Sequence, residues 1–281
     1  MVSSSHVVVL GAVAGFTIFL GLPTGRLRTT ATGLKAFLNA CALGVLIFLF
    51  YDVIAHAIEP VEGALIGAAI NHTGSWWRFV AYAAVFVAGL CIGLLGLVAY
   101  DRRLASNRAT RSAGAAVATA RDNRPLVRLS EARRLAVYIA VGIGLHNFSE
   151  GLAIGQSAAK GEISLALALI VGFGLHNATE GFGIVAPLAG EQERPSWRFL
   201  IAMGLIGGGP TLVGTIIGQS IVNDTLFLTF LALAAGSILY VVVQLFRVAF
   251  KLGHNELLMV GLLVGLLAGF ATDFVLVAVG A

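Results

Sequence analysis

Charged residues are scarce in this chain of 281 residues. Asp, Glu, Lys and Arg together make up 11% of it, whereas 58% of it is hydrophobic and the mean hydropathy is +0.93. A soluble protein carries about 25% charged residues, so this composition excludes an ordinary soluble domain. Cysteine is rare too, and because Cys41 and Cys91 both lie within apolar runs, no disulfide framework is expected.

What the chain has instead is a series of apolar runs long enough to cross a bilayer. A membrane-spanning helix needs about 20 predominantly apolar residues. We therefore predict an all-α polytopic membrane protein, a single transmembrane domain over residues 1–281 with eight spans. The predicted spans are 7–22, 36–58, 79–100, 135–155, 163–186, 199–222, 226–250 and 257–280.

The basic residues predict the orientation. With both termini outside, sixteen of the 18 lysines and arginines fall in the inner loops, and only Arg78 and Lys160 remain outside. Nine of the sixteen lie in the polar segment 101–134, which we expect to be a cytoplasmic loop that contacts anionic lipid headgroups. The net charge of +4 is thereby accounted for by topology, and no nucleic-acid partner is expected.

One short phrase occurs twice within predicted spans. It reads His-Asn-Phe-Ser-Glu-Gly at 146–151 and His-Asn-Ala-Thr-Glu-Gly at 176–181. Ionisable residues inside the membrane are costly, and they usually mark a functional site facing the protein interior. In a helix, residues four apart share one face, so His146 lies beside Glu150 and His176 beside Glu180.

The residue types in this phrase are those of a metal site. Two carboxylates in a low-dielectric interior repel each other unless a cation or proton separates them. Mixed imidazole and carboxylate ligands suit Zn²⁺, Fe²⁺, Mn²⁺ or Co²⁺, whereas Mg²⁺ and Ca²⁺ prefer oxygen ligands only. We expect a His–Glu site of two histidines and two glutamates, and a second, weaker amide site built from Asn147, Asn177 and the same carboxylates. A purely structural hydrogen-bonded pair between helices is the alternative.

A weaker repeat relates two further spans. Ala-Leu-Gly-Val-Leu at 42–46 resembles Ala-Ala-Gly-Ser-Ile at 234–238, and in this register Asp52 corresponds to Gln244. By the predicted orientation the two spans are antiparallel, an arrangement typical of transporters with inverted repeats. Asp52 and His56 are four apart near the outer end of their span. We interpret them, with Gln244, as candidates for the transport pathway; hydrogen bonds that only join the helices are the alternative.

The duplicated phrase and the eight spans resemble the ZIP (Zrt/Irt-like) metal transporters. The resemblance implies uptake of a divalent transition metal into the cytoplasm through a two-metal site between the fourth and fifth spans. It also implies a 3+2+3 arrangement of helices with inverted pseudo-symmetry. The residues that match the family's metal sites are His146, Asn147, Glu150, His176, Asn177 and Glu180.

The chain departs from the family pattern at three places. Ser149 and Thr179 stand where proline often precedes the motif glutamate. Gly209 precedes Pro210 in place of a glutamate, so the resemblance implies that the amide site lacks one ligand. The segment 101–134 contains no histidine, so a histidine-rich metal-sensing loop is not expected.

The sequence therefore predicts a multi-pass transporter of the plasma membrane, with the lipid bilayer as its surroundings. Its substrate is a divalent metal ion, Zn²⁺ first and Fe²⁺, Mn²⁺, Co²⁺ or Cd²⁺ as alternatives; it is not expected to be an enzyme. The rival from another class is an intramembrane metalloenzyme that uses the same histidines and glutamates. The oligomeric state stays open between a monomer and a homodimer.

Overall fold

The computed structural model describes residues 4–27, 32–114, 129–159, 163–191, 193–221 and 223–278. Within these ranges all regular secondary structure is helical, as the apolar runs predict. In chain order the helices are α1 (Ser4–Phe16), α2 (Ile18–Gly21), η1 (Leu22–Arg26), α3 (Thr32–Ala69), α4 (Trp76–Gly114), α5 (Glu131–Ala159), α6 (Ile163–Val185), η3 (Ala186–Gly190), α7 (Trp197–Gly218), α8 (Asp224–Leu252) and α9 (Asn255–Ala278).

The chain is a polytopic α-helical membrane protein. Seven stretches of the described residues are long and apolar enough to cross a bilayer, and they lie in α1–η1, α3, α4, α5, α7, α8 and α9. The remaining long helix, α6, has 23 residues, also enough to cross.

Two helices continue beyond the predicted spans. Helix α3 continues to Ala69, with Pro60 inside it, so Glu59 and Glu62, which follow the predicted span 36–58, are helical. Helix α4 continues to Gly114, so the first part of the predicted loop 101–134 is helical, and its last residues begin α5. Alanine and arginine are strong helix formers, and they extend a helix beyond its apolar segment. Residues 115–128 lie outside the described residues.

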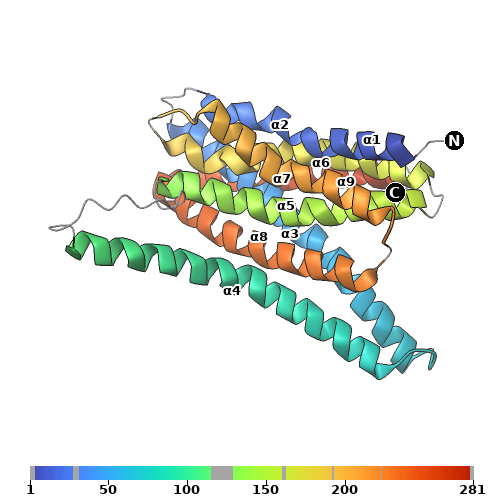
Figure 1. The fold of residues 1–281 in the computed structure, drawn as a ribbon. Helices are drawn as coiled ribbons and strands as arrows, with labels where there is room; N and C mark the ends of the chain where they lie inside the picture. The colour runs from blue at the N-terminus through green and yellow to red at the C-terminus, as the bar shows by residue number, and fades with distance from the viewer. Residues whose placement is uncertain are drawn as a thin grey trace.

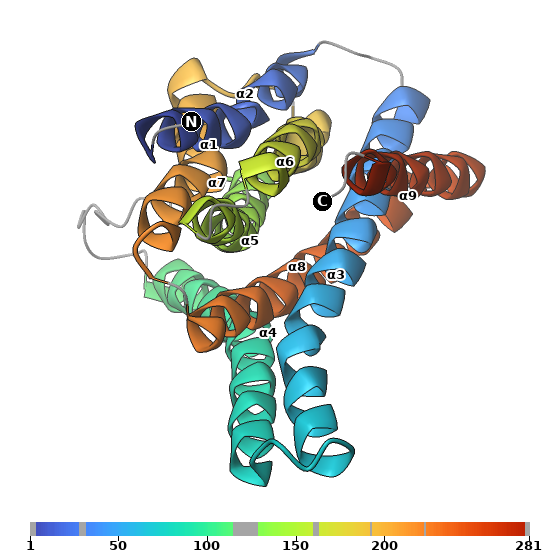
Figure 2. The same cartoon turned by 90° about the vertical axis from the view of Figure 1, so that its right-hand side faces the viewer.

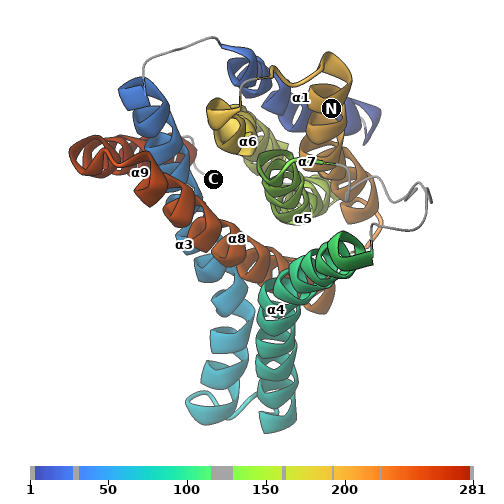
Figure 3. The same ribbon diagram turned by 90° about the vertical axis from the view of Figure 1, so that its left-hand side faces the viewer.

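The helices form two groups (Figures 1–3). Helices α1, α5, α6 and α7 gather into one group, called the site bundle because it carries the duplicated phrase. Helices α3, α4, α8 and α9 form the frame bundle, and α5 packs against α8 where the two groups meet. Within its most apolar window α5 is 78% buried, whereas α4 is 11% buried, so α4 contributes mainly lipid-facing surface.

Glycine-mediated contacts reveal an inverted repeat. A Cβ built on Gly214 of α7 would clash with Phe148 O, Leu152 N and Gly151 C of α5. A Cβ on Gly21, at the end of α2, would clash with the equivalent atoms of Ala178, Phe182 and Gly181 in α6. The two copies of the phrase thus pack against α7 and α1–α2 in the same way.

The frame bundle repeats the pattern. Gly44 of α3 meets Leu262, Gly265 and Leu266 of α9. Gly236 of α8 meets Leu90, Gly93 and Leu94 of α4, again with the same spacing. The weak similarity between residues 42–46 and 234–238 therefore reflects equivalent packing positions, which supports the predicted pseudo-symmetry.

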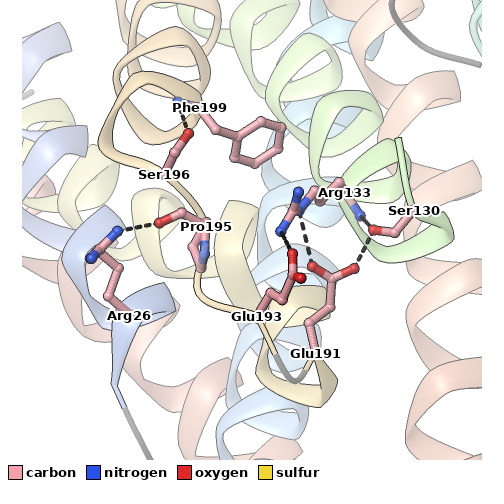
Figure 4. Close-up of polar contacts among 8 residues, drawn as sticks. All are labelled: Arg26, Ser130, Arg133, Glu191, Glu193, Pro195, Ser196 and Phe199. Carbon is pink, nitrogen blue, oxygen red and sulfur yellow. Dashed lines mark hydrogen bonds and ion pairs between the residues drawn. The ribbon is translucent and has the colours of Figure 1, made fainter. Parts of the chain in front are cut away.

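Polar contacts join the loops at one end of the site bundle (Figure 4). Arg133 of α5 pairs with Glu191 at 3.1 Å and with Glu193 at 3.8 Å, and Ser130 donates a hydrogen bond to Glu191. In the same region Arg26 donates to Pro195 O and lies 4.7 Å from the centre of the Trp197 ring. These contacts, at the end predicted to be cytoplasmic, hold η1, the start of α5 and the α6–α7 connection together.

Candidate metal site

The first copy of the phrase lies just past the middle of α5. Its His146 and Glu150 are 3% and 5% exposed, and His146 Nε2 lies 3.0 Å from Glu150 Oε1. The predicted pairing along one helix face is therefore present. A buried carboxylate needs a compensating charge, and the imidazole beside it can share a proton or a metal ion with it.

The second copy meets the first through Asn147. The Asn147 amide donates to Glu180 Oε2 at 3.1 Å and to Gly207 O at 3.0 Å, and both Asn147 and Glu180 are 0% exposed. This side chain of α5 thus contacts α6 and α7 at once. It also places one carboxylate of the second copy beside the first copy.

Backbone carbonyls of α1 and α7 hold the two asparagines in equivalent positions. Asn177 donates to Ala14 O of α1 at 3.0 Å, as Asn147 donates to Gly207 O of α7. Near Gly207, Pro210 lies inside α7 and cannot donate a hydrogen bond to Ile206 O, so the helical ladder is interrupted. These carbonyl partners could not be predicted from the sequence, because every residue carries a backbone acceptor.

Of the four residues predicted for the His–Glu site, His146 pairs with Glu150, and Glu180 is bonded to Asn147. The fourth residue is His176. Its backbone lies in α6, but its side chain lies outside the described residues. In the part of the chain that the structure describes, no group of three or more His, Cys, Asp and Glu side chains is close enough to hold a metal ion. The described half of the His–Glu site is therefore His146 with Glu150, joined to Glu180 through Asn147.

Gly209 does not face the amide site. A Cβ built on it meets nothing within 4 Å, and its neighbours one turn away, Leu205 and Val213, are 53% and 48% exposed. A glutamate at this position would extend from the outward side of α7. The inward side of α7 is formed by Gly207, Gly208 and Thr211, all buried.

Ser149 and Thr179, at the positions of the family's prolines, lie within unbroken helices α5 and α6. Ser149 is 0% exposed, and its hydroxyl is directed at Leu145 O, 3.5 Å away on the preceding turn of its own helix. Because both helices continue without a break, the phrase presents its side chains with ordinary helical spacing.

The three pathway candidates lie on α3 and α8, outside the two helices that carry the phrase. His56 Nδ1 lies 3.4 Å from Asp52 Oδ1 and 2.9 Å from Asp52 O, and the side chains are 51% and 21% exposed. Gln244 lines a cavity of about 380 Å³ between α5, η3 and α8. Glu131, Glu191, Arg247 and Lys251 line the same cavity.

An α-helical membrane bundle with buried histidine, glutamate and asparagine side chains on two adjacent, inversely repeated helices defines a class of metal-handling membrane proteins. Comparison with known families agrees: the family model described as ZIP Zinc transporter matches residues 101–276, which is well over half of the chain. The chain therefore belongs to the ZIP family of divalent metal transporters. No curated protein matches the chain.

Proposed function

We propose that the protein moves Zn²⁺, or a divalent ion of similar ligand preference, across the membrane through a site between α5 and α6. The observation that carries the proposal is the bridge from Asn147 to Glu180 beside the His146–Glu150 pair. The bridge links α5, which carries the buried His146–Glu150 pair, to the buried Glu180 carboxylate of α6. Carboxylate and imidazole ligands suit Zn²⁺ and related transition metals.

Two further features support transport over catalysis by the same residues. The site lies inside a membrane-spanning bundle built from inverted repeats, an arrangement that suits access from either side. The hydroxyl of Ser149, a candidate nucleophile for an enzyme, is directed toward a carbonyl of its own helix.

The direction of movement is proposed from the topology. The positive-inside distribution puts Gln244 and its cavity on the cytoplasmic side, and Asp52 with His56 on the outer side. Uptake would then run from the outer pair, past the His–Glu site, to the inner cavity. The plasma membrane is the proposed location.

Metal uptake into proteoliposomes tests the proposal. We expect the purified protein to carry Zn²⁺ into vesicles that contain a fluorescent chelator, and Glu150→Gln and Glu180→Gln to lower the rate at least about 10-fold. Glu62→Gln, which alters an exposed carboxylate of α3, is the matched control and should leave the rate unchanged. A panel of Fe²⁺, Mn²⁺, Co²⁺ and Cd²⁺ ranks the substrates.

Two results would contradict the proposal. A wild-type protein that binds ions of the panel but moves none would favour the intramembrane enzyme instead. Unchanged uptake by both site variants would show that the metal does not pass between α5 and α6.

A further inference from the structure

Two basic residues of α8 line the cavity between α5, η3 and α8 without an acidic partner among the described residues. Arg247 and Lys251 are one helical turn apart, and both line this cavity of about 380 Å³. The Arg247 guanidinium donates to Gln244 Oε1 at 3.4 Å, and neither basic side chain forms an ion pair in the described part of the chain. Like charges four residues apart on a helix repel each other, so an anion beside them would stabilise the pair.

The charges that line the cavity do not cancel. The wall formed by α5 and the end of η3 carries Glu131 and Glu191, opposite the two basic residues of α8. Glu191 is already paired with Arg133, which lies 3.1 Å away and does not line the cavity. Glu131 alone therefore faces Arg247 and Lys251, which leaves an excess of one positive charge.

The cavity lies where both helices change from apolar to charged residues. On α5 the charged first turn ends at Arg134, and the apolar run begins at Leu135. On α8 residues 225–246 carry no charge, and the basic end of the helix follows. Such a change marks the boundary between the hydrocarbon core and the headgroups. Leu135, Pro187 and Val248 also line the cavity, so its lining suits a molecule with a charged head and an apolar body.

The rim of the cavity borders the lipid-facing side of α8. Val243 and Phe250 are 45% and 60% exposed, and they lie four residues before and three residues after Arg247. Residues at these spacings share one side of a helix. Arg247 thus lies between the exposed apolar stripe of α8 and the cavity, and a lipid can enter sideways from the bilayer.

We infer that this cavity binds the headgroup of one anionic phospholipid, with the phosphodiester oxygens held by Arg247 and Lys251. Phosphate oxygens are strong acceptors for guanidinium and ammonium groups. The single negative charge of a lipid such as phosphatidylglycerol balances the excess positive charge, whereas zwitterionic phosphatidylcholine does not. Basic pockets between membrane helices are typical sites for anionic headgroups.

Thermal unfolding of the purified full-length protein in detergent tests the inference. Phosphatidylglycerol should raise the thermal midpoint of the wild type more than phosphatidylcholine does, because a ligand of the folded state stabilises it. Glycerol 3-phosphate at the same concentration, which offers a phosphate without acyl chains, should have no effect. The double variant Arg247→Gln/Lys251→Gln should bind phosphatidylglycerol at least about 10-fold more weakly, because each basic residue near the headgroups contributes about 5-fold.

Two further variants control for charge and for folding. Arg102→Gln/Arg103→Gln removes the same charge from exposed positions on α4, and it should respond to phosphatidylglycerol as the wild type does. Glu131→Gln removes the carboxylate that faces the two basic residues, and it should bind phosphatidylglycerol more tightly than the wild type. A loss in one variant and a gain in another cannot both result from poor folding.

A second readout measures transport and rests on the proposed function. Two basic side chains oppose a divalent cation that leaves through their cavity, and a bound phosphate removes this opposition. Zn²⁺ uptake by the wild type should therefore be faster in vesicles of equal parts phosphatidylglycerol and phosphatidylcholine than in phosphatidylcholine alone. The gain should shrink in Arg247→Gln/Lys251→Gln.

The outcomes separate this inference from the proposed function. Equal stabilisation by the two lipids, or an effect of phosphatidylglycerol that persists in Arg247→Gln/Lys251→Gln, would overturn the lipid site. An equal effect of glycerol 3-phosphate would overturn it too, in favour of a soluble phosphate. Selective loss of binding in that variant upholds the site even in a protein that carries no Zn²⁺. Binding without any change in the uptake rate also leaves the site standing and contradicts only the exit of metal through this cavity.

Discussion

At the scale of single residues, Asn147 is the side chain that connects the first copy of the phrase to the second. Its amide is fully buried and makes one bond to a carboxylate of α6 and one to a carbonyl of α7. Hydrogen bonds that orient a metal-binding carboxylate are as much part of a metal site as the ligands themselves. The residue therefore links the position of Glu180 to the position of α7.

Replacing Asn147 by alanine should weaken Zn²⁺ binding by about 10–100-fold, because Glu180 loses its donor and its fixed orientation. Competition against a fluorescent chelator in detergent measures the affinity. Asn71→Ala, on the exposed turn between α3 and α4, is the control and should bind as the wild type does. Equal Zn²⁺ affinities of the Asn147 and Asn71 variants would show that Asn147 does not contribute to the metal site.

Gly209 stands where the family resemblance implies a glutamate, but the position faces outward from α7. A glutamate placed there should therefore not act as a metal ligand. Gly209→Glu should not raise the number of Zn²⁺ ions bound per chain, because the new carboxylate faces away from the asparagines. It should lower the thermal midpoint, since a charge facing lipid costs about 2.5–3.5 kcal/mol near the bilayer centre. Gly209→Leu, apolar at the same place, should be tolerated. A higher metal-to-protein ratio in Gly209→Glu, measured by elemental analysis, would show that the position does face the site.

These residues also show what the sequence could and could not predict. Helical spacing alone predicted the His146–Glu150 pair, because residues four apart on a helix must be neighbours. The rotation of α7 about its own axis decides where Gly209 points, and no local pattern encodes that rotation. The acceptors Ala14 O and Gly207 O could not be predicted either, because every residue carries a backbone carbonyl.

At the scale of elements, the glycine that ends each phrase determines how closely the helices pack. A Cβ on Gly151 or Gly181 would lie under 3.0 Å from a backbone oxygen of α7 or α1–α2. Helix pairs in membranes lack a hydrophobic drive, so close backbone packing through small residues is a main source of their stability. The side chains proposed to bind metal thus lie on two helices, each of which packs closely against a neighbour: α5 against α7, and α6 against α1–α2.

Alanine at Gly151 should force α5 away from α7. We expect a destabilisation of about 1–3 kcal/mol, typical of overpacking, together with weaker Zn²⁺ binding. Gly183→Ala is the matched control, because a Cβ there meets nothing within 4 Å and alanine in a helix interior is favoured over glycine by about 0.5–1 kcal/mol. Thermal unfolding in detergent should therefore shift down for Gly151→Ala and slightly up for Gly183→Ala. Shifts of the same sign in the two variants would contradict the packing described for α5 and α7.

At the scale of the whole molecule, the uneven burial of the helices indicates which of them contact the lipid of the bilayer. The site helix α5 is covered by neighbours, while α4 and α9 present large apolar side chains such as Ile92 and Leu267 at their surfaces. Water-soluble proteins rarely expose so much apolar surface, and in a bilayer it is satisfied by lipid. The frame bundle therefore covers α5 on the side of α8, while α4 and α9 present much of their own surface to lipid.

The predicted orientation can be tested on the intact protein. Thr73, in the connection between α3 and α4, should lie outside, and Glu193, in the α6–α7 connection beside Arg133, should lie inside. In a background with Cys41→Ala and Cys91→Ala, a membrane-impermeant maleimide applied to sealed right-side-out vesicles should label Thr73→Cys at once. Glu193→Cys should react only after the vesicles are opened, because nearly all basic loops are retained on the cytoplasmic side. The reverse pattern of labelling would invert the molecule in the membrane and with it the proposed direction of metal movement, since the cavity at Gln244 would then open outward.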